Sequence, residues 1–309
     1  MERSRRVTLV AVGAMVTAGA CWGLAAVMAK TAFDRGVSPV RMAEARVVVA
    51  LVVLAALLAW RRRDLLKPPP GTMPVLVAFG LSVAAVNSTY YVAIDRLAVG
   101  VAISLQYTAP VLLLGWAALT ATRRGPRRSA WLAAGLTLAG AVLVSRAYTG
   151  LRRVDGLGLV AAAGSAVFFA TYLLTAGRAG VRGVHQATVL FWGFVVAVLT
   201  WGVIAPWWSW PVGKLAESSV TLAVLGVGIV GTLIPFFLAV GALRVLPPAT
   251  AGIAATVEPP FAAAFAWLLL NQHLSIVQIV GGMLVVAGVV LAQRATAVMP
   301  EALAVEPVS

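Results

Sequence analysis

Apolar and polar positions alternate along this chain in long blocks rather than residue by residue. An α-helix that rises 1.5 Å per residue needs about 20 residues to cross ~30 Å of hydrocarbon, and the apolar blocks are near that length. The pattern therefore predicts an all-α integral membrane protein with ten transmembrane helices. The expected helices span residues 7–29, 38–60, 72–94, 99–121, 129–147, 156–177, 185–206, 218–242, 249–270 and 274–293.

The second half of the sequence repeats the first. The stretch from Ala93 to Pro110 returns as the stretch from Ala242 to Pro259, at an offset of 149 residues. Each half then holds five crossings, and an odd number places the two repeats in opposite, inverted orientations with a shared site near mid-membrane. We expect a first repeat of five helices at 7–147, a second at 156–293, and a disordered cytoplasmic tail at 294–309.

Composition agrees with a lipid environment. Apolar residues make up 61% of the chain and charged residues 11%, and the mean hydropathy is +0.96. A soluble domain carries about 25% charged residues, so this chain cannot cover a water-facing surface. The net charge of +14 sits in short runs between apolar blocks, which indicates contact with anionic lipid head groups rather than nucleic acid.

Basic residues also set the orientation. With the N-terminus inside, the cytoplasmic loops hold 15 Lys and Arg and the outer loops hold 8, which favours both termini in the cytoplasm. The basic N-terminus followed by an apolar run resembles a signal peptide, with a lipoprotein cleavage before Cys21 as the alternative. The apolar run continues to Ala29, so we interpret it as an uncleaved first membrane helix. Cys21 is the sole cysteine, so an internal disulfide is excluded.

The order of several short motifs resembles the drug/metabolite transporter superfamily, and within it the EamA-type permeases. The motifs are Trp22-Gly23 with Lys30, Pro39 with Arg46, Ala93 to Pro110, Glu258-Pro259, and Gln278 to Gly288. The resemblance implies ten helices, an inner (plasma) membrane of bacterial type, and export or uptake of small metabolites, with amino-acid exporters the best-known members. Such permeases usually carry Gly-Glu-Arg after the fourth and ninth helices. This chain has Ala121-Thr122-Arg123-Arg124 and Asn271-Gln272-His273 there, which affects local capping more than transport.

Glu258 is the strongest candidate for a functional residue. It lies about nine residues into its expected helix, or roughly 13 Å deep. An ionised carboxylate at that depth costs on the order of 3 kcal/mol, so it should face a cavity or stay protonated, and it could couple transport to protons. Pro259 and Pro260 break the helix there and leave the carbonyls of Ala255 and Thr256 without helical donors. The alternative is a protonated acid bonded to a neighbouring helix at a structural kink.

Pro110 is the counterpart of Pro259 and frees the carbonyl of Gln106. Gln106 and Tyr107 are candidate substrate contacts from this second break, although polar residues in membrane helices also bond simply to other helices. Ala109 stands where the other repeat has Glu258, so the site should be asymmetric.

Arg46 lies deep in the second expected helix, with no acidic residue three or four positions away. It should face the cavity, where it could bind a carboxylate, or snorkel outward. Arg41 and Glu44 are three apart and can pair at the outer rim.

Trp22 and Tyr172 stand in the first helices of the two repeats and are either cavity walls or packing residues. Gly228, Gly231 and Pro235 share one face and indicate either a hinge or close packing. We expect no metal and no cofactor, because both histidines fall in loops and no glycine-rich phosphate loop is present.

These features favour a secondary transporter that exports small metabolites by alternating access. An exporter of amino acids is the leading hypothesis, because a deep acid and a deep arginine suit a zwitterion and because the resemblance implies amino-acid exporters among the relatives. A multidrug exporter for lipophilic cations is the alternative, followed by a non-transporting scaffold or channel. An intramembrane enzyme is disfavoured because no Ser–His, paired Asp or His/Glu cluster lies at membrane depth. Expected partners are the small-molecule substrate, membrane lipid and protons, and the internal repeat favours a functional monomer.

Overall fold

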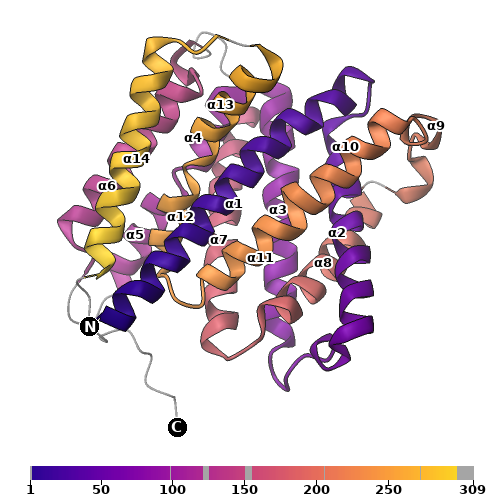
Figure 1. The fold of residues 1–309 in the computed structure, drawn as a ribbon, viewed down its shortest axis with the longest axis horizontal. Helices are drawn as coiled ribbons and strands as arrows, with labels where there is room; N and C mark the ends of the chain where they lie inside the picture. Colours follow the sequence, from indigo (N-terminus) through magenta and orange to yellow (C-terminus); the bar gives the residue numbers. More distant parts are fainter. Residues whose placement is uncertain are drawn as a thin grey trace.

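The computed structural model describes residues 2–97, 99–120, 125–149, 155–204, 206–271 and 273–297. The regular elements of these residues are helices packed side by side (Figure 1). They are α1 Glu2–Asp34, α2 Pro39–Arg61, η1 Arg63–Leu66, α3 Met73–Arg96, α4 Val99–Gln106, α5 Ala109–Thr120, α6 Arg128–Val144, η2 Ala147–Thr149, α7 Gly156–Val181, α8 Gln186–Ile204, η3 Trp207–Ser209, α9 Val212–Leu215, α10 Ser218–Gly228, η4 Ile229–Leu233, α11 Ile234–Ala242, α12 Pro248–Ala255, α13 Glu258–Leu270 and α14 Ile276–Ala297.

Within the described residues, nine helical spans are long and apolar enough to cross a membrane. The helix α6, with 17 residues, is a shorter tenth. Three crossings are composite, because α4 continues into α5, α10 passes through η4 into α11, and α12 continues into α13. The predicted all-helical membrane fold with two repeats is confirmed, and the first turn of α1 lies at the same end as the last turn of α14 (Figure 1).

The helix ends differ from the expected ones at both ends of the chain. Helix α1 extends beyond 7–29 in both directions, and an ion pair of 3.1 Å between Lys30 and Asp34 stabilises its last turn. Helix α14 continues to Ala297, past the expected start of the tail at 294. The rest of that tail, 298–309, lies outside the described residues, as do 121–124 and Gln272.

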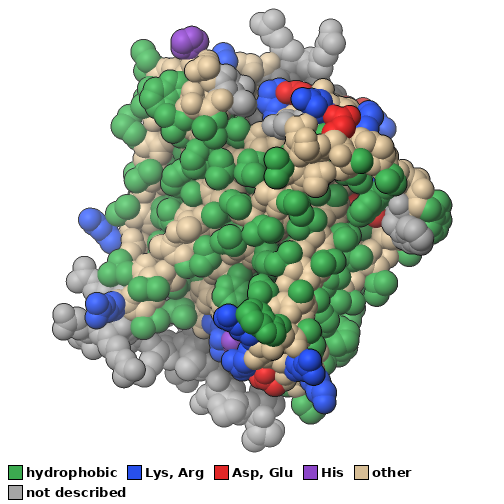
Figure 2. Space-filling model, turned by 45° about the vertical axis from the view of Figure 1, so that its right-hand side comes forward, with side chains coloured by type: hydrophobic (Ala, Val, Ile, Leu, Met, Phe, Trp, Pro, Cys, Tyr) green, Lys and Arg blue, Asp and Glu red, His purple; other side chains and the backbone are tan. Residues whose placement is uncertain are grey.

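The lateral surface of the molecule is apolar. Leu119, Val203 and Ile276 are each at least 80% exposed, at 87%, 83% and 80%. Figure 2 shows hydrophobic side chains over the middle of one face, with most of the charged side chains at the two ends. Exposing so many apolar side chains to water is unfavourable, so this band is the surface that contacts lipid.

Small residues bring helices of the two repeats into close contact. A Cβ atom added at Gly140 of α6 would lie 2.5 Å from the carbonyl oxygen of Gly281 of α14. A Cβ atom added at Gly281 would in turn lie 2.8 Å from the oxygen of Gly140. Backbone approach through small residues is a main source of helix association in lipid, where helices gain little from the hydrophobic effect.

The eighth crossing contains a π-helical turn at η4. Thr232 Oγ1 donates to the carbonyl oxygen of Val227, five residues earlier, at 2.9 Å. Gly231 packs directly against the Cβ atom of Ala25 on α1, and a Cβ atom at Gly228 would lie 2.5 Å from Val49 Cγ1 on α2. The sequence left hinge and close packing as alternatives for this segment, and the structure has both irregular helix and close packing there.

One end of the molecule is held by polar contacts between the repeats. The predicted Arg41–Glu44 ion pair is confirmed, with 2.8 Å between Arg41 Nη1 and Glu44 Oε2. Trp210 Nε1, from the second repeat, donates to the same Glu44 oxygen at 2.6 Å. Arg35 also pairs with Glu217 across the repeats at 3.0 Å.

Candidate functional site

The two broken crossings meet inside the molecule. Helix α4 ends at Gln106 and α5 begins at Ala109, whereas α12 ends at Ala255 and α13 begins at Glu258. Helices α5 and α12 are in contact, and a Cβ atom at Gly252 would lie 3.2 Å from Pro110 Cγ. Each break falls just before a proline, because proline cannot donate the hydrogen bond that would continue the helix.

Tyr107 and Glu258 join the two breaks. The Tyr107 hydroxyl donates to Glu258 Oε2 at 2.6 Å, and the Tyr107 side chain is buried, with 2% exposed. Glu258 is the first residue of α13, so its carboxylate stands at the positive end of that helix dipole. The N-terminus of a half-helix inside a membrane is a recurring ligand site in transporters.

Helix α1 packs tightly against the N-terminal end of α13. A Cβ atom added at Gly23 would lie 2.7 Å from the backbone nitrogen of Ala262 and 3.0 Å from the carbonyl oxygen of Glu258. Position 23 therefore needs glycine, which explains why Gly23 follows Trp22 in the motif.

Arg46 supplies a positive charge to this region. Arg46 Nη2 donates to Asn87 Oδ1 at 2.6 Å, and Asn87 Nδ2 donates to the carbonyl oxygen of Val83 at 2.7 Å. The arginine therefore binds α3 and does not snorkel outward. It lies within electrostatic range of Glu258.

Aromatic side chains form a wall around Tyr172. Its ring lies 5.8 Å from Phe169 in a stacked pair, 5.4 Å from Phe79 and 5.6 Å from Phe236. Trp22 meets Phe236 edge to face at 5.8 Å. Phe236 thus connects the two candidate residues from the first helices of the repeats.

Four buried polar atoms have no hydrogen-bond partner among the described residues. They are Arg46 Nε, Gln106 Oε1, Tyr172 OH and Trp201 Nε1. Leaving such an atom unpaired costs roughly 1–3 kcal/mol, so each of the four is a candidate to bond a ligand or a water molecule. Three of the four belong to residues that the sequence singled out.

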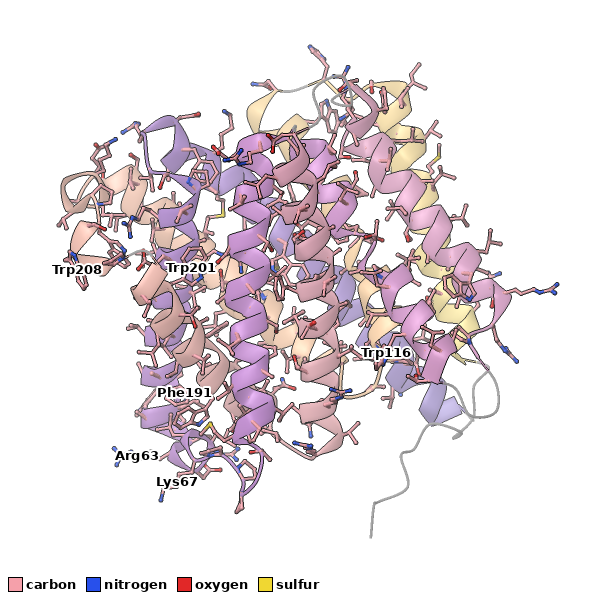
Figure 3. The ribbon with its side chains drawn as sticks, turned by 180° about the vertical axis from the view of Figure 1, so that it is seen from behind. Arg63, Lys67, Trp116, Phe191, Trp201 and Trp208 are labelled. Carbon is pink, nitrogen blue, oxygen red and sulfur yellow. The ribbon has the colours of Figure 1, made fainter. Side chains whose placement is uncertain are left out.

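Trp201 is the residue that sequence reasoning missed. Its side chain is 2% exposed, and Figure 3 places it further along α8 than Phe191, away from the end with Arg63 and Lys67. Helices α3 and α8 touch at Gly80 and Val196, and Asn87 and Trp201 lie about 10 Å and 8 Å beyond that contact along their helices. Trp201 is therefore at the depth of the Arg46–Asn87 pair. The sequence did not indicate a functional role for Trp201, because most buried tryptophans in apolar helices serve packing.

The histidines are outside this site. Around His185, at the start of α8, partial burial and the positive charges of Arg244 and Arg62 lower the pKa of its imidazole, and Asp64 opposes them. His185 Nδ1 accepts a hydrogen bond from the backbone nitrogen of Ala187 at 3.2 Å and caps α8. Among the described residues, no group of three His, Cys, Asp or Glu side chains could hold a metal ion.

The fold and the paired helix breaks define a multi-pass membrane protein of the transporter class, built from two related halves. The profile of the EamA-like transporter family matches residues 9–146 and again residues 156–293. The chain belongs to the EamA-like transporter family.

Known proteins resemble this chain in sequence and in fold. The chain is similar to the threonine/homoserine exporter RhtA of Salmonella typhimurium (strain LT2) and to RhtA of Escherichia coli (strain K12). Each is 27% identical over 250 residues, which cover 79% of this chain and 76% of the relative. A solved crystal structure also matches with a TM-score of 0.76 at 20% identity, over 91% of this chain and 96% of that one, so the fold is shared.

Proposed function

We propose that this chain exports amino acids by alternating access and couples their movement to protons through Glu258. The observation that carries the proposal is the Tyr107–Glu258 hydrogen bond, which links the helix breaks of the two repeats. Movement of one repeat against the other would stretch or break this hydrogen bond. Substrate or proton binding there could therefore change which side of the membrane the site faces.

The charges around the bond support a zwitterionic substrate. Glu258 offers an acceptor for an ammonium group, next to the carbonyls that Pro259 and Pro260 leave free. Arg46 Nε and Trp201 Nε1 are buried donors without acceptors among the described residues, and a carboxylate would satisfy both. The similarity to exporters named for threonine and homoserine supports the same substrate class.

The contacts also support roles for the other candidates. Gln106 Oε1 and the Tyr172 hydroxyl have no hydrogen-bond partner in the part of the chain that the structure describes, and each could bond to the polar part of a small substrate. Trp22 and the Tyr172 ring would limit the size of the substrate through their contacts with Phe236.

A lipophilic cation is the second candidate substrate. The ring cluster of Tyr172, Phe79, Phe169 and Phe236 presents several aromatic faces, and such faces attract cations. Glu258 would then neutralise the cation, and Arg46 would disfavour it.

The similarity to bacterial exporters supports an inner (plasma) membrane location. The excess of Lys and Arg in the expected cytoplasmic loops, 15 against 8 in the outer loops, supports both termini in the cytoplasm. The two repeats complete one site within a single chain, which supports a functional monomer.

The test is transport by purified protein in liposomes under an imposed pH gradient. Labelled amino acids and labelled lipophilic cations are followed in wild type, in Glu258→Gln and in the control Glu217→Gln. Glu217 is an acid of the Arg35 ion pair, with 45% of its side chain exposed, so its loss leaves the site intact.

We expect gradient-driven movement of amino acids in wild type and in Glu217→Gln, and at least a tenfold loss in Glu258→Gln. Equal unfolding temperatures would establish that the three proteins are folded. Gradient-driven transport that survives in Glu258→Gln would exclude the proton role. Movement of cations alone by folded wild type would replace the amino-acid proposal with the second candidate.

A further inference from the structure

A groove runs between α1 and α11, two helices from different repeats that lie side by side on the front of the molecule (Figure 1). It has a volume of about 570 Å³. Along α1 it is lined from Arg6 through Val10 to Ala14, and along α11 and the following turn from Phe237 to Val245. The candidate substrate site, at Tyr107 and Glu258, shares none of these residues.

The walls of the groove are apolar and open to the side of the molecule. Val10 is 68% exposed and Val245 is 47% exposed. Val10 lies within a membrane-spanning helix, so its part of the groove faces the hydrocarbon of the bilayer rather than water, whereas Val245 lies in the turn that follows α11. An aliphatic chain is the only abundant partner with matching chemistry at this place.

One end of the groove is polar. Arg6 and Gln186 are its two polar lining residues, and both stand where helices begin at the same end of the molecule. The sequence adds Arg3 and Arg5 just before Arg6. A basic pocket between membrane helices near one surface is the arrangement that binds anionic lipid head groups.

The length of the groove fits one leaflet. Arg6 and Ala14 are eight residues apart on α1, which corresponds to about 12 Å along the helix. One leaflet contributes about 15 Å of hydrocarbon, half of the ~30 Å core. A chain that follows α1 from Arg6 to Ala14 would thus run from the head-group level to near the middle of the membrane.

We propose that this groove is a binding site for an anionic phospholipid. One acyl chain lies along α1 and α11, and the phosphate is bound by Arg6 with Gln186 beside it. Because α1 belongs to the first repeat and α11 to the second, the bound lipid contacts both halves of the protein. The site is independent of the transported substrate, so the proposed function can fail while this proposal holds.

The test measures lipid binding by native mass spectrometry of the full chain in detergent. Phosphatidylglycerol and phosphatidylcholine with the same acyl chains are titrated against wild type, Arg6→Gln, Ala14→Phe and the control Arg63→Gln. Arg63 is the first residue of η1, just after α2 (Figure 3). It is exposed, and it is not among the residues that line the groove.

We expect wild type and Arg63→Gln to prefer phosphatidylglycerol equally. One basic side chain contributes about 1 kcal/mol to attraction of anionic lipid, so Arg6→Gln should bind phosphatidylglycerol about fivefold more weakly and phosphatidylcholine unchanged. Ala14→Phe fills the inner end of the groove and should weaken both lipids. Equal losses in Arg6→Gln and Arg63→Gln would mean diffuse attraction to a basic surface and would overturn the proposal.

A second measurement does not depend on the variants. A phosphatidylglycerol with a photoreactive group near the end of one acyl chain is irradiated with the wild-type protein in liposomes. We expect labelled peptides from α1 near Ala14 and from α11 near Leu238. Labelling spread evenly over the lateral helices, including α2 and α14, would contradict a defined groove.

Discussion

Tyr107 and Glu258 come from different repeats and share a hydrogen bond of 2.6 Å between the hydroxyl and the carboxylate. Each stands at the helix break of its own repeat. The bond therefore directly connects the irregular segments that precede Pro110 and Pro259.

The strength of this bond can be measured with a double-mutant cycle. Tyr107→Phe and Glu258→Leu, which removes the acceptor, are made singly and together, and the free energy of unfolding is determined in detergent. Hydrogen bonds between membrane helices are worth about 0.6 kcal/mol on average and up to about 1.7, and a carboxylate acceptor favours the upper part of that range. We expect a coupling energy of about 1–1.5 kcal/mol.

The control cycle pairs Glu258→Leu with Tyr148→Phe. Tyr148 lies in η2 and is 43% exposed, so these two changes should add within about 0.5 kcal/mol. An additive result for Tyr107 and Glu258 as well would mean that the bond has no net energetic role.

Two glycines of α1 should respond oppositely to alanine. The Cβ atom of Gly23→Ala would press on backbone atoms of α13, including Ala262 N at 2.7 Å, and backbone yields poorly. We expect this change to destabilise the protein by about 1–3 kcal/mol through overpacking. At Gly13 nothing lies within 4 Å of the added Cβ atom, so Gly13→Ala should stabilise by up to about 1 kcal/mol through helix propensity. Thermal unfolding checks both, and equal effects would refute the close contact of α1 with α13.

Tyr172→Phe distinguishes a packing role from substrate contact. The Tyr172 hydroxyl is buried without a partner among the described residues, so its removal should raise the free energy of unfolding by about 1–2 kcal/mol. If the hydroxyl bonds to substrate, KM should rise severalfold in the same variant. Higher stability with unchanged transport would assign Tyr172 to packing alone. Tyr107→Phe is the comparison: it loses a formed hydrogen bond, so it should lower the free energy of unfolding.

His185, which lies outside the membrane helices, contributes to the stability of the protein in a pH-dependent way. Burial, with help from Arg244 and Arg62, lowers the pKa of His185 in the folded state below its value in the unfolded chain. The unfolded state therefore takes up a proton first, so this contribution to stability is present above about pH 6.5 and falls as the pH drops below that value.

Protonation would also remove the Nδ1 acceptor that caps α8 at the Ala187 nitrogen. His185→Asn keeps a capping acceptor that does not titrate. We expect this variant to lose less stability between pH 7 and pH 5 than wild type does. Identical pH profiles for the two proteins would show that His185 does not contribute.

The sequence predicted the fold because each crossing is a long apolar block with its own boundary. Pro110 and Pro259 also indicated where the fourth and ninth crossings are irregular, since proline acts on its own helix. The partners of side chains were harder to predict, because they depend on how distant helices are placed. Arg46 binds Asn87 from α3, and Glu44 accepts a hydrogen bond from Trp210 in addition to that from its neighbour Arg41. Neither of these long-range contacts leaves a local pattern in the sequence.

The short helix α6 affects the membrane around the protein. Its 17 residues span about 25 Å, which is less than the ~30 Å of a typical hydrocarbon core. Leu132 on α6 is 59% exposed, so this helix meets lipid directly, and its contact with α14 through Gly140 and Gly281 restricts movement of the helix toward either surface. Lipid beside α6 must therefore compress to match it, at a cost of a fraction of a kcal/mol per Å of mismatch. The protein thus imposes an uneven hydrophobic thickness on its surroundings and is better matched to thin bilayers than to thick ones.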